Sequence, residues 1–201
     1  MQNKSSFRNS AVYTVLALTL ICLIVTGAVA AVNTITYERI YSLDQARAAE
    51  AMRTVLPDAT LYSGIDSMEN YRFEDVITAF YEATDADGNV IGYCVEATPN
   101  GFSDKLTLIC GINAEGIVQG VSIVDATNET PGVGSRVTEE SFYSQFVGKN
   151  AAVKLVRGVA SAANEVSAVS GATYSSRGVC EGVQSCLRAV ATYTEVNGKN
   201  E

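Results

Sequence analysis

The feature that most restricts how this chain can fold is an uninterrupted apolar run near its N-terminus. Residues 11–32, AVYTVLALTLICLIVTGAVAAV, contain 22 residues and no charged side chain. At 1.5 Å per residue a helix of this length spans about 33 Å, enough to cross the hydrocarbon core of a bilayer. We therefore expect a transmembrane helix over residues 11–33 that anchors the chain in membrane lipid.

The distribution of charge predicts how this helix is oriented. Lys4 and Arg8 precede it, and the first basic residue after it is Arg39. Because basic residues stay on the cytoplasmic side, we expect residues 1–10 to form a cytoplasmic tail in the cell (inner) membrane, with the C-terminal domain extracytoplasmic. The chain has a net charge of −8, of which the first 33 residues contribute +2, so the remainder carries −10. That acidity argues against nucleic acid as a partner.

Two other interpretations of the apolar run stay open. Ala28-Val29-Ala30 fits a signal-peptidase site, but the run is longer than the 7–15 residues typical of a signal core, which favours a retained anchor. A pilin-like protein also begins with an apolar helix, although pilins usually carry an acidic residue early in that stretch. Here the first acidic residue is Glu38.

The composition excludes several kinds of catalytic site. The chain contains no histidine, so it cannot form a Ser-His-Asp or Cys-His nucleophile and lacks the usual zinc ligand. We expect no catalytic residue and no metal site in the chain alone. The five cysteines are scattered, which argues against an iron–sulfur cluster. Disulfides within the domain stay open for four of them, Cys94, Cys110, Cys180 and Cys186.

The rest of the chain predicts a connecting helix followed by one domain. Residues 34–57 have apolar positions at helical spacing and end at Pro57, and we expect residues 58–201 to form the domain. The expected fold class is mixed α/β (α+β), with antiparallel strand pairs and flanking helices. The segments expected are a hairpin turning at DADGNV (residues 85–90), strands at 106–111 and 117–124 turning at 114–116, a helix at 139–148, a strand at 151–156 and a helix from about 176 to 193.

The most distinctive motif is SAVSGATYSSRGV, residues 167–179. Its small and hydroxyl side chains lie between a strand-like AVS and the last helix. Backbone N–H groups at a helix N-terminus bind phosphate, and small residues let a bulky ligand approach. An ordinary helix cap would also explain the serine and threonine residues.

SGATYSS resembles the flavinylation motif of the FMN-binding domain family. Members include the G subunit of the Rnf electron-transport complex and the C subunit of the sodium-translocating NADH:quinone oxidoreductase. Three further segments are similar to family segments: YEATDADGNVIGYCVEATPNGF (81–102), NETPGVGSRV (128–137) and FYSQFVGK (142–149). The short chain and single anchor favour the Rnf branch of the family over the quinone reductase branch.

The resemblance implies that Thr173 is joined to FMN by a phosphoester, which a separate flavin transferase makes from FAD with magnesium. Ser170, Gly171, Ala172, Tyr174, Ser175 and Ser176 would then hold the phosphate, and Glu129, Thr130 and Gly132 would flank the ring. One position departs from the family: Ser167 stands where an aspartate is usual, and Glu165 is near but out of register. Without the resemblance, ETPG is a plain turn and Asn128-Glu129-Thr130 a glycosylation sequon.

The function implied is an electron-relay component of a membrane-bound ion-translocating ferredoxin:NAD⁺ oxidoreductase, without complete activity of its own. Its partners would be the other membrane and flavin subunits of the Rnf complex. The coupling ion, sodium or proton, stays open. Two other functions stay open as well: a cofactor-free membrane-anchored scaffold, and an extracytoplasmic flavin-dependent reductase.

Overall fold

A computed structural model describes residues 11–65 and 68–197, so the predicted tail at residues 1–10 lies outside the described residues. The chain divides into two units, residues 1–46 and 47–201. Helix α1, Ala11–Val55, runs from the first unit into the second without a break at residue 33 or 34. It is long and apolar enough to cross a membrane. It ends two residues before Pro57, the helix breaker expected there.

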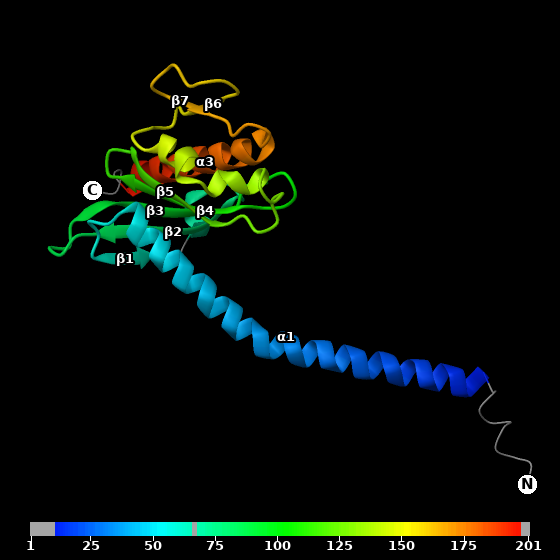
Figure 1. Ribbon diagram of the computed structural model, residues 1–201. Helices are drawn as coiled ribbons and strands as arrows, with labels where there is room; N and C mark the ends of the chain where they lie inside the picture. The colour runs from blue at the N-terminus through cyan, green and yellow to red at the C-terminus, as the bar shows by residue number, and fades with distance from the viewer. Residues whose placement is uncertain (1–10, 66–67, 198–201) are drawn as a thin grey trace, which may run out of the picture. The chain divides into compact units, whose positions relative to one another are not determined.

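The centre of the second unit is a five-stranded antiparallel sheet in the order β1-β2-β3-β4-β5 (Figure 1). Its strands are β1 Leu61–Gly64, β2 Ile77–Thr84, β3 Val90–Ala97, β4 Thr107–Asn113 and β5 Val118–Asp125. The turn between β2 and β3 is closed by the Asp85 carboxylate, which accepts the N–H groups of Asp87 and Asn89 at 2.9 Å each. The antiparallel pairings of β2 with β3 and of β4 with β5 confirm both predicted hairpins. The turns contain Asp-Gly and Glu-Gly, and a glycine in such a turn favours a hairpin.

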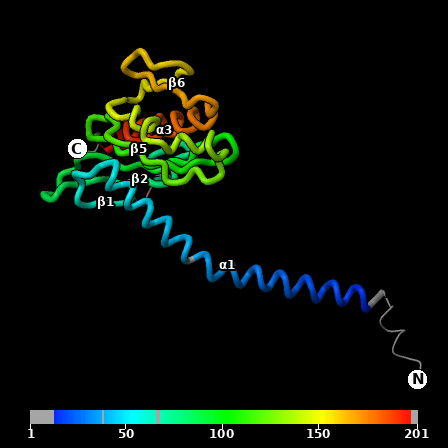
Figure 2. Tube along the Cα trace, viewed as in Figure 1, coloured from blue at the N-terminus to red at the C-terminus, as the bar shows by residue number. Residues whose placement is uncertain are grey.

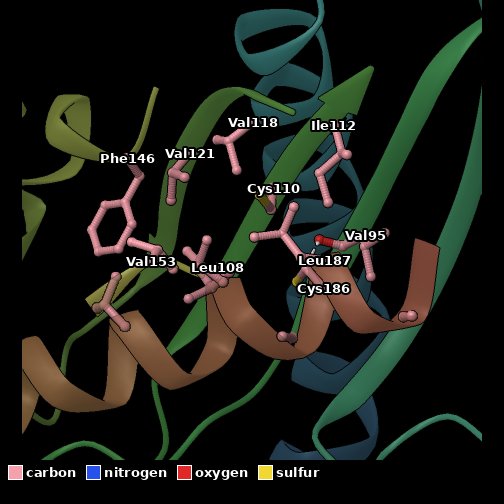
Figure 3. Packing of buried hydrophobic residues seen from close by; sticks show 14 of the residues in the cluster. Val95, Leu108, Cys110, Ile112, Val118, Val121, Phe146, Val153, Cys186 and Leu187 are labelled. Carbon is pink, nitrogen blue, oxygen red and sulfur yellow. Dashed lines mark hydrogen bonds between the residues drawn. The ribbon is translucent and has the colours of Figure 1, made fainter. Parts of the chain in front are cut away.

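Each face of the sheet is covered by a helix. Helix α3, Thr173–Asn197, packs on one face, where Leu108 and Cys110 of β4 meet Cys186 and Leu187 (Figure 3). The end of α1 packs on the other, against a cluster that includes Ile109. Successive residues of a strand point to opposite faces, so β4 is apolar on both and its sequence contains the continuous run LICGI.

Short elements complete the domain: the 3₁₀ helices η1 Met68–Tyr71, η2 Gly134–Thr138 and η3 Ser144–Phe146, the helix α2 Glu140–Tyr143, and the strands β6 Lys154–Val156 and β7 Glu165–Ser167. The predicted helix at 139–148 is therefore α2 followed directly by η3, and the predicted strand at 151–156 is the shorter β6. The pairing of β6 with β7 is parallel and was not predicted. The loop between them, residues 157–164, projects from the domain (Figure 2).

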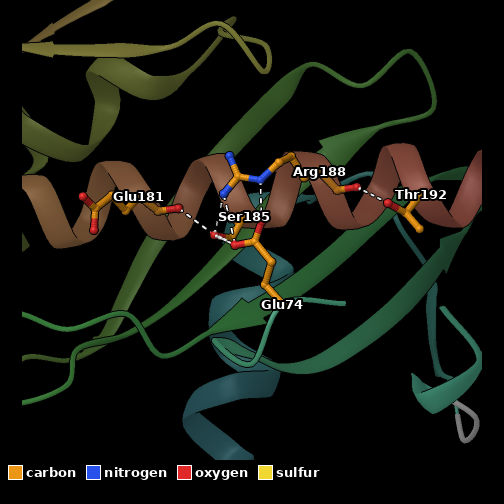
Figure 4. Close-up of polar contacts among 5 residues, drawn as sticks. All are labelled: Glu74, Glu181, Ser185, Arg188 and Thr192. Atoms are coloured by element: carbon orange, nitrogen blue, oxygen red, sulfur yellow. Dashed lines mark hydrogen bonds and ion pairs between the residues drawn. The ribbon is translucent and has the colours of Figure 1, made fainter. Parts of the chain in front are cut away.

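An ion pair fastens the segment before β2 to the exposed side of α3 (Figure 4). Glu74 accepts hydrogen bonds from Arg188 Nε at 2.6 Å and from Ser185 Oγ at 2.7 Å. These bonds lower the pKa of the Glu74 carboxyl, with the Arg188 contact as the largest cause. Both charged side chains are about half exposed, so the pair contributes at most about 1 kcal/mol to stability.

Candidate functional site

The SGAT motif forms the turn that leads from β7 into α3. Gly171 has φ +82°, a conformation that favours glycine, and the helix begins at Thr173, three residues before the predicted start. The first helical hydrogen bond runs from Ser176 N–H to the Ala172 carbonyl at 2.9 Å. Thr173 therefore lies in the first turn, where backbone N–H groups have no partner within the helix.

The serines of the motif do not cap this helix. Ser176 Oγ accepts a hydrogen bond from Val169 N–H at 3.0 Å, and Ser175 Oγ donates to Glu129 at 2.5 Å. The residue before the helix is Ala172, whose side chain has no acceptor. The ordinary cap that the composition suggested therefore does not explain why serine occupies positions 175 and 176.

An apolar cavity of about 250 Å³ opens beside the turn. Its wall contains two exposed aromatic rings, Phe102 and Tyr174, whose centroids are 6.0 Å apart. The remaining lining residues are small, aliphatic or hydroxyl-bearing: Thr130, Val133, Gly134, Gly171, Ala172 and Ser175. Aromatic and aliphatic walls with a few hydroxyl groups suit a flat, largely apolar ligand.

A second cavity of about 320 Å³ adjoins the first and has a different character. Arg157, Thr173 and Arg177 line it, together with Gly171 and Tyr174, which line both cavities. The Arg177 guanidinium lies 5.7 Å from the centre of the Tyr174 ring, within the range of a cation–π contact. No acidic residue is among the lining residues, so this cavity suits an anion.

Glu129 lies behind the apolar cavity and lines neither cavity. It is 3% exposed, and its carboxylate accepts Phe102 N–H at 2.7 Å and the Ser175 hydroxyl at 2.5 Å. The carboxylate fits because two neighbours lack side chains: a Cβ on Gly101 or Gly134 would lie 2.1 or 2.4 Å from its oxygens. Glu129 thus joins the Phe102 loop to the first turn of α3.

Backbone contact also brings this loop close to α3. A Cβ on Gly178 would lie 2.2 Å from the carbonyl oxygen of Asn100, and one on Gly182 would lie 2.8 Å from the Pro99 ring. The helix backbone therefore rests directly on residues 99–100, two residues before Phe102.

The structure brings most of the predicted site residues together. Thr130, Gly171, Ala172, Tyr174 and Ser175 line the apolar cavity, and Thr173 lines the basic one. The others, Ser170, Ser176, Glu129 and Gly132, line neither. Sequence reasoning missed Phe102, Val133, Gly134 and Arg157 as lining residues. A phenylalanine directly after Pro99-Asn100-Gly101 was the available signal for Phe102, and no local pattern indicated Arg157.

Ser167 has a structural role at the position where the resemblance leads us to expect aspartate. Its hydroxyl oxygen accepts Ala160 N–H at 2.8 Å, and its own N–H donates to Gln145 Oε1 at 2.9 Å. The nearby Glu165 carboxylate accepts from Ser161 and Ala162 of the same loop. Both side chains therefore hold the loop between β6 and β7.

Comparison with known proteins agrees with this geometry. Residues 101–188, which contain Phe102, Glu129 and Thr173, match the family model of the FMN-binding domain. The G subunit of the ion-translocating oxidoreductase complex of Methanosarcina acetivorans is 29% identical over 86% of this chain and 93% of its own length. The G subunit of the proton-translocating ferredoxin:NAD⁺ oxidoreductase complex of Clostridium ljungdahlii is 28% identical over 72% of each chain.

The fold is shared with a solved structure. The C subunit of the Na⁺-translocating NADH-quinone reductase from Parabacteroides distasonis superimposes with a TM-score of 0.54, at 17% identity, over 78% of this chain and 94% of that chain. The expected mixed α+β class is confirmed. The chain therefore carries a domain of the FMN-binding domain family and is related to the G subunits of ion-translocating oxidoreductase complexes.

Proposed function

We propose that this chain is an electron-relay subunit of a membrane-bound, ion-translocating ferredoxin:NAD⁺ oxidoreductase complex, with FMN attached to Thr173 through a phosphoester. The observation that carries the proposal is the position of Thr173 in the basic cavity, next to an apolar cavity with an aromatic wall. The names of the relatives support the complex, and the other subunits would be the redox partners.

The residues present fit each part of FMN. The wall with Phe102, Val133 and Tyr174 is apolar, as an isoalloxazine ring requires. The cavity with Arg157 and Arg177 is basic, as a phosphate requires. FMN would supply the redox chemistry, and the chain's own residues would bind and orient it.

The remaining parts of the proposal concern location. We place residues 1–10 in the cytoplasm and the domain outside, from the basic residues at positions 4 and 8. A covalent bond is then useful, because a dissociated cofactor would be lost to the medium. Residues 11–32 contain no Asp, Glu, Lys, Arg or His side chain that could pass an ion across the membrane. We therefore assign ion transport to the partner proteins of the complex.

Intact-mass measurement with peptide mapping tests this proposal. The full chain should be purified from its native host, or from a host that supplies the flavin transferase. We expect a mass increase of about 438 Da, the mass of FMN less water, on the peptide that contains Thr173. Thr173→Ala should remove the increase and leave the domain folded, whereas Thr127→Ala, an exposed threonine outside both cavities, should keep it.

The outcomes separate the alternatives. An unmodified wild-type chain, in a host whose transferase modifies other proteins, would refute covalent attachment and favour the colourless scaffold. Full modification of Thr173→Ala would refute the assignment of the residue. A modified chain that reduces a soluble acceptor and does not co-purify with membrane proteins of the complex would favour the extracytoplasmic reductase.

A further inference from the structure

Arg157 reaches the attachment site from a separate part of the fold. It is the first residue after β6 and lines the same cavity as Thr173, from which it is separated by the loop that follows β6 and by the strand β7. Arg177, one helical turn after Thr173, lines the cavity from α3. Two arginines from different elements therefore line one cavity with Thr173.

The loop that follows Arg157 is held at several points. Glu165 Oε2 accepts Ser161 N–H at 2.9 Å, Ser161 Oγ at 3.1 Å and Ala162 N–H at 3.2 Å. Ser167 Oγ accepts Ala160 N–H at 2.8 Å, and Lys149 Nζ donates to the Ala163 carbonyl. The backbone that carries Arg157 is thus positioned by both strands of the parallel pair and by a lysine outside it.

The charges around the hydroxyl group are not balanced within the domain. Neither arginine forms an ion pair with an acidic side chain among residues 11–65 and 68–197, although the chain as a whole carries −8. Two like charges at one cavity repel each other, and a cation near the N-terminus of a helix opposes the helix dipole. An anion bound between the arginines would relieve both effects.

We propose that Arg157 and Arg177 form the binding site for the phosphate of the flavin nucleotide and hold its phosphorus beside Thr173 Oγ. This inference rests on the proposed function and adds Arg157 as a positioning residue for attachment. In the attachment step, the bond from Thr173 Oγ to phosphorus forms and the phosphoanhydride bond of FAD breaks. AMP leaves with the bonding electron pair, the hydroxyl proton passes to a base of the transferase or to water, and nothing is oxidised or reduced.

The rate of flavin attachment tests the proposal directly. Full-length chains with Arg157→Gln or Arg177→Gln would be incubated with FAD, magnesium and a limiting amount of flavin transferase, and modification followed by intact mass. We expect each variant to be modified at least about tenfold more slowly than wild type, since a charged hydrogen bond to phosphate is lost. Arg157→Lys should restore part of the rate.

Lys154→Gln is the matched control, because Lys154 is an exposed cation on β6 that lines neither cavity. It should be modified at the wild-type rate. Thermal unfolding of every variant would show that the domain remains folded. Arg157→Gln and Arg177→Gln variants that are folded and modified as fast as Lys154→Gln would overturn the proposal.

A second measurement does not depend on the covalent bond. In a Thr173→Ala background, the affinities for FMN and riboflavin would be compared by fluorescence titration, because the two ligands differ only by the phosphate. We expect FMN to bind about tenfold more tightly, and Arg157→Gln to remove the preference. Equal binding of FMN and riboflavin would contradict the phosphate site, whereas an unmodified wild-type chain that still prefers FMN would contradict only the covalent attachment.

Discussion

Replacing Glu129 by alanine should destabilise the domain, and the structure gives the expected size of the effect. The carboxylate accepts two short hydrogen bonds, from Phe102 N–H at 2.7 Å and Ser175 Oγ at 2.5 Å, and a longer one from Ser103 N–H at 3.4 Å. Hydrogen bonds to a charged group contribute about 1.5–3 kcal/mol each, so losing the two short bonds removes about 3–6 kcal/mol.

The variant also avoids the desolvation cost of burying a carboxylate, which is 3% exposed in the wild-type chain, and this offsets part of the lost stability. We therefore expect Glu129→Ala to lower the free energy of unfolding by about 2–4 kcal/mol. For a chain of this size, each kcal/mol corresponds to about 2–4 °C in the melting temperature. Glu129→Gln keeps the shape and one acceptor and should cost about 1–2 kcal/mol.

Thermal unfolding in detergent, followed by circular dichroism, measures these differences. Glu139→Ala is the matched control: Glu139 also belongs to the segment before α2, but its bond to Arg136 joins two side chains that are 48% and 45% exposed. It should change the free energy of unfolding by less than about 1 kcal/mol. If Glu129→Ala melts at the same temperature as wild type, the carboxylate does not fasten the Phe102 loop to α3 and the reasoning fails.

Two further predictions concern packing and the thiols. Gly178→Ala places a Cβ 2.2 Å from the Asn100 carbonyl oxygen and should lower the free energy of unfolding by about 1–3 kcal/mol. The control Gly158→Ala places a Cβ that meets nothing within 4 Å and should lower it by less than about 1 kcal/mol. Equal melting temperatures of the two variants would refute the close contact. Burial raises the pKa of Cys94 to about 12, that of Cys180 to about 11 and that of Cys110 well above its ordinary value. All four cysteines of the domain are buried from the reagent, so iodoacetamide at about pH 8 should label none of them until urea is added. Resistance to labelling in urea without a reductant would show disulfides instead of the free thiols of the structure.

The two hairpins of the sheet were predictable because their signals are local, whereas the strand β1 was not predicted. The turn at residues 85–89 carries Asp-Gly between two apolar-rich strands, and α3 has apolar residues at helical spacing. A strand was expected at residues 151–156, where β6 lies, but its pairing with β7 was missed, since a strand of three residues is too short to show a period. The start of α3 was placed late, because serines at 175 and 176 resemble caps but bond elsewhere.

The site was predictable only in part, because some of its residues form one continuous motif and others come from separate segments. Thr173 and its neighbours form one continuous motif, so the resemblance located them. Arg157 and Phe102 come from other segments, and only the tertiary fold brings Arg157 to the cavity of Thr173 and Phe102 to Tyr174. Glu129 was expected to flank the ring, but it does not line the apolar cavity. Its carboxylate occupies the space that Gly101 and Gly134 leave by having no side chain.

The backbone contact between α3 and residues 99–100 has a mechanical consequence. The loop that carries Phe102 and the helix that carries Thr173 touch through main-chain atoms, which cannot change rotamer as side chains do. The aromatic wall and the hydroxyl group should therefore move together as one rigid body when the domain fluctuates. Rigid support of this kind fixes the geometry of a functional site. A redox group mounted there would keep a constant distance to whatever protein docks on the same face, whichever way the rest of the domain bends.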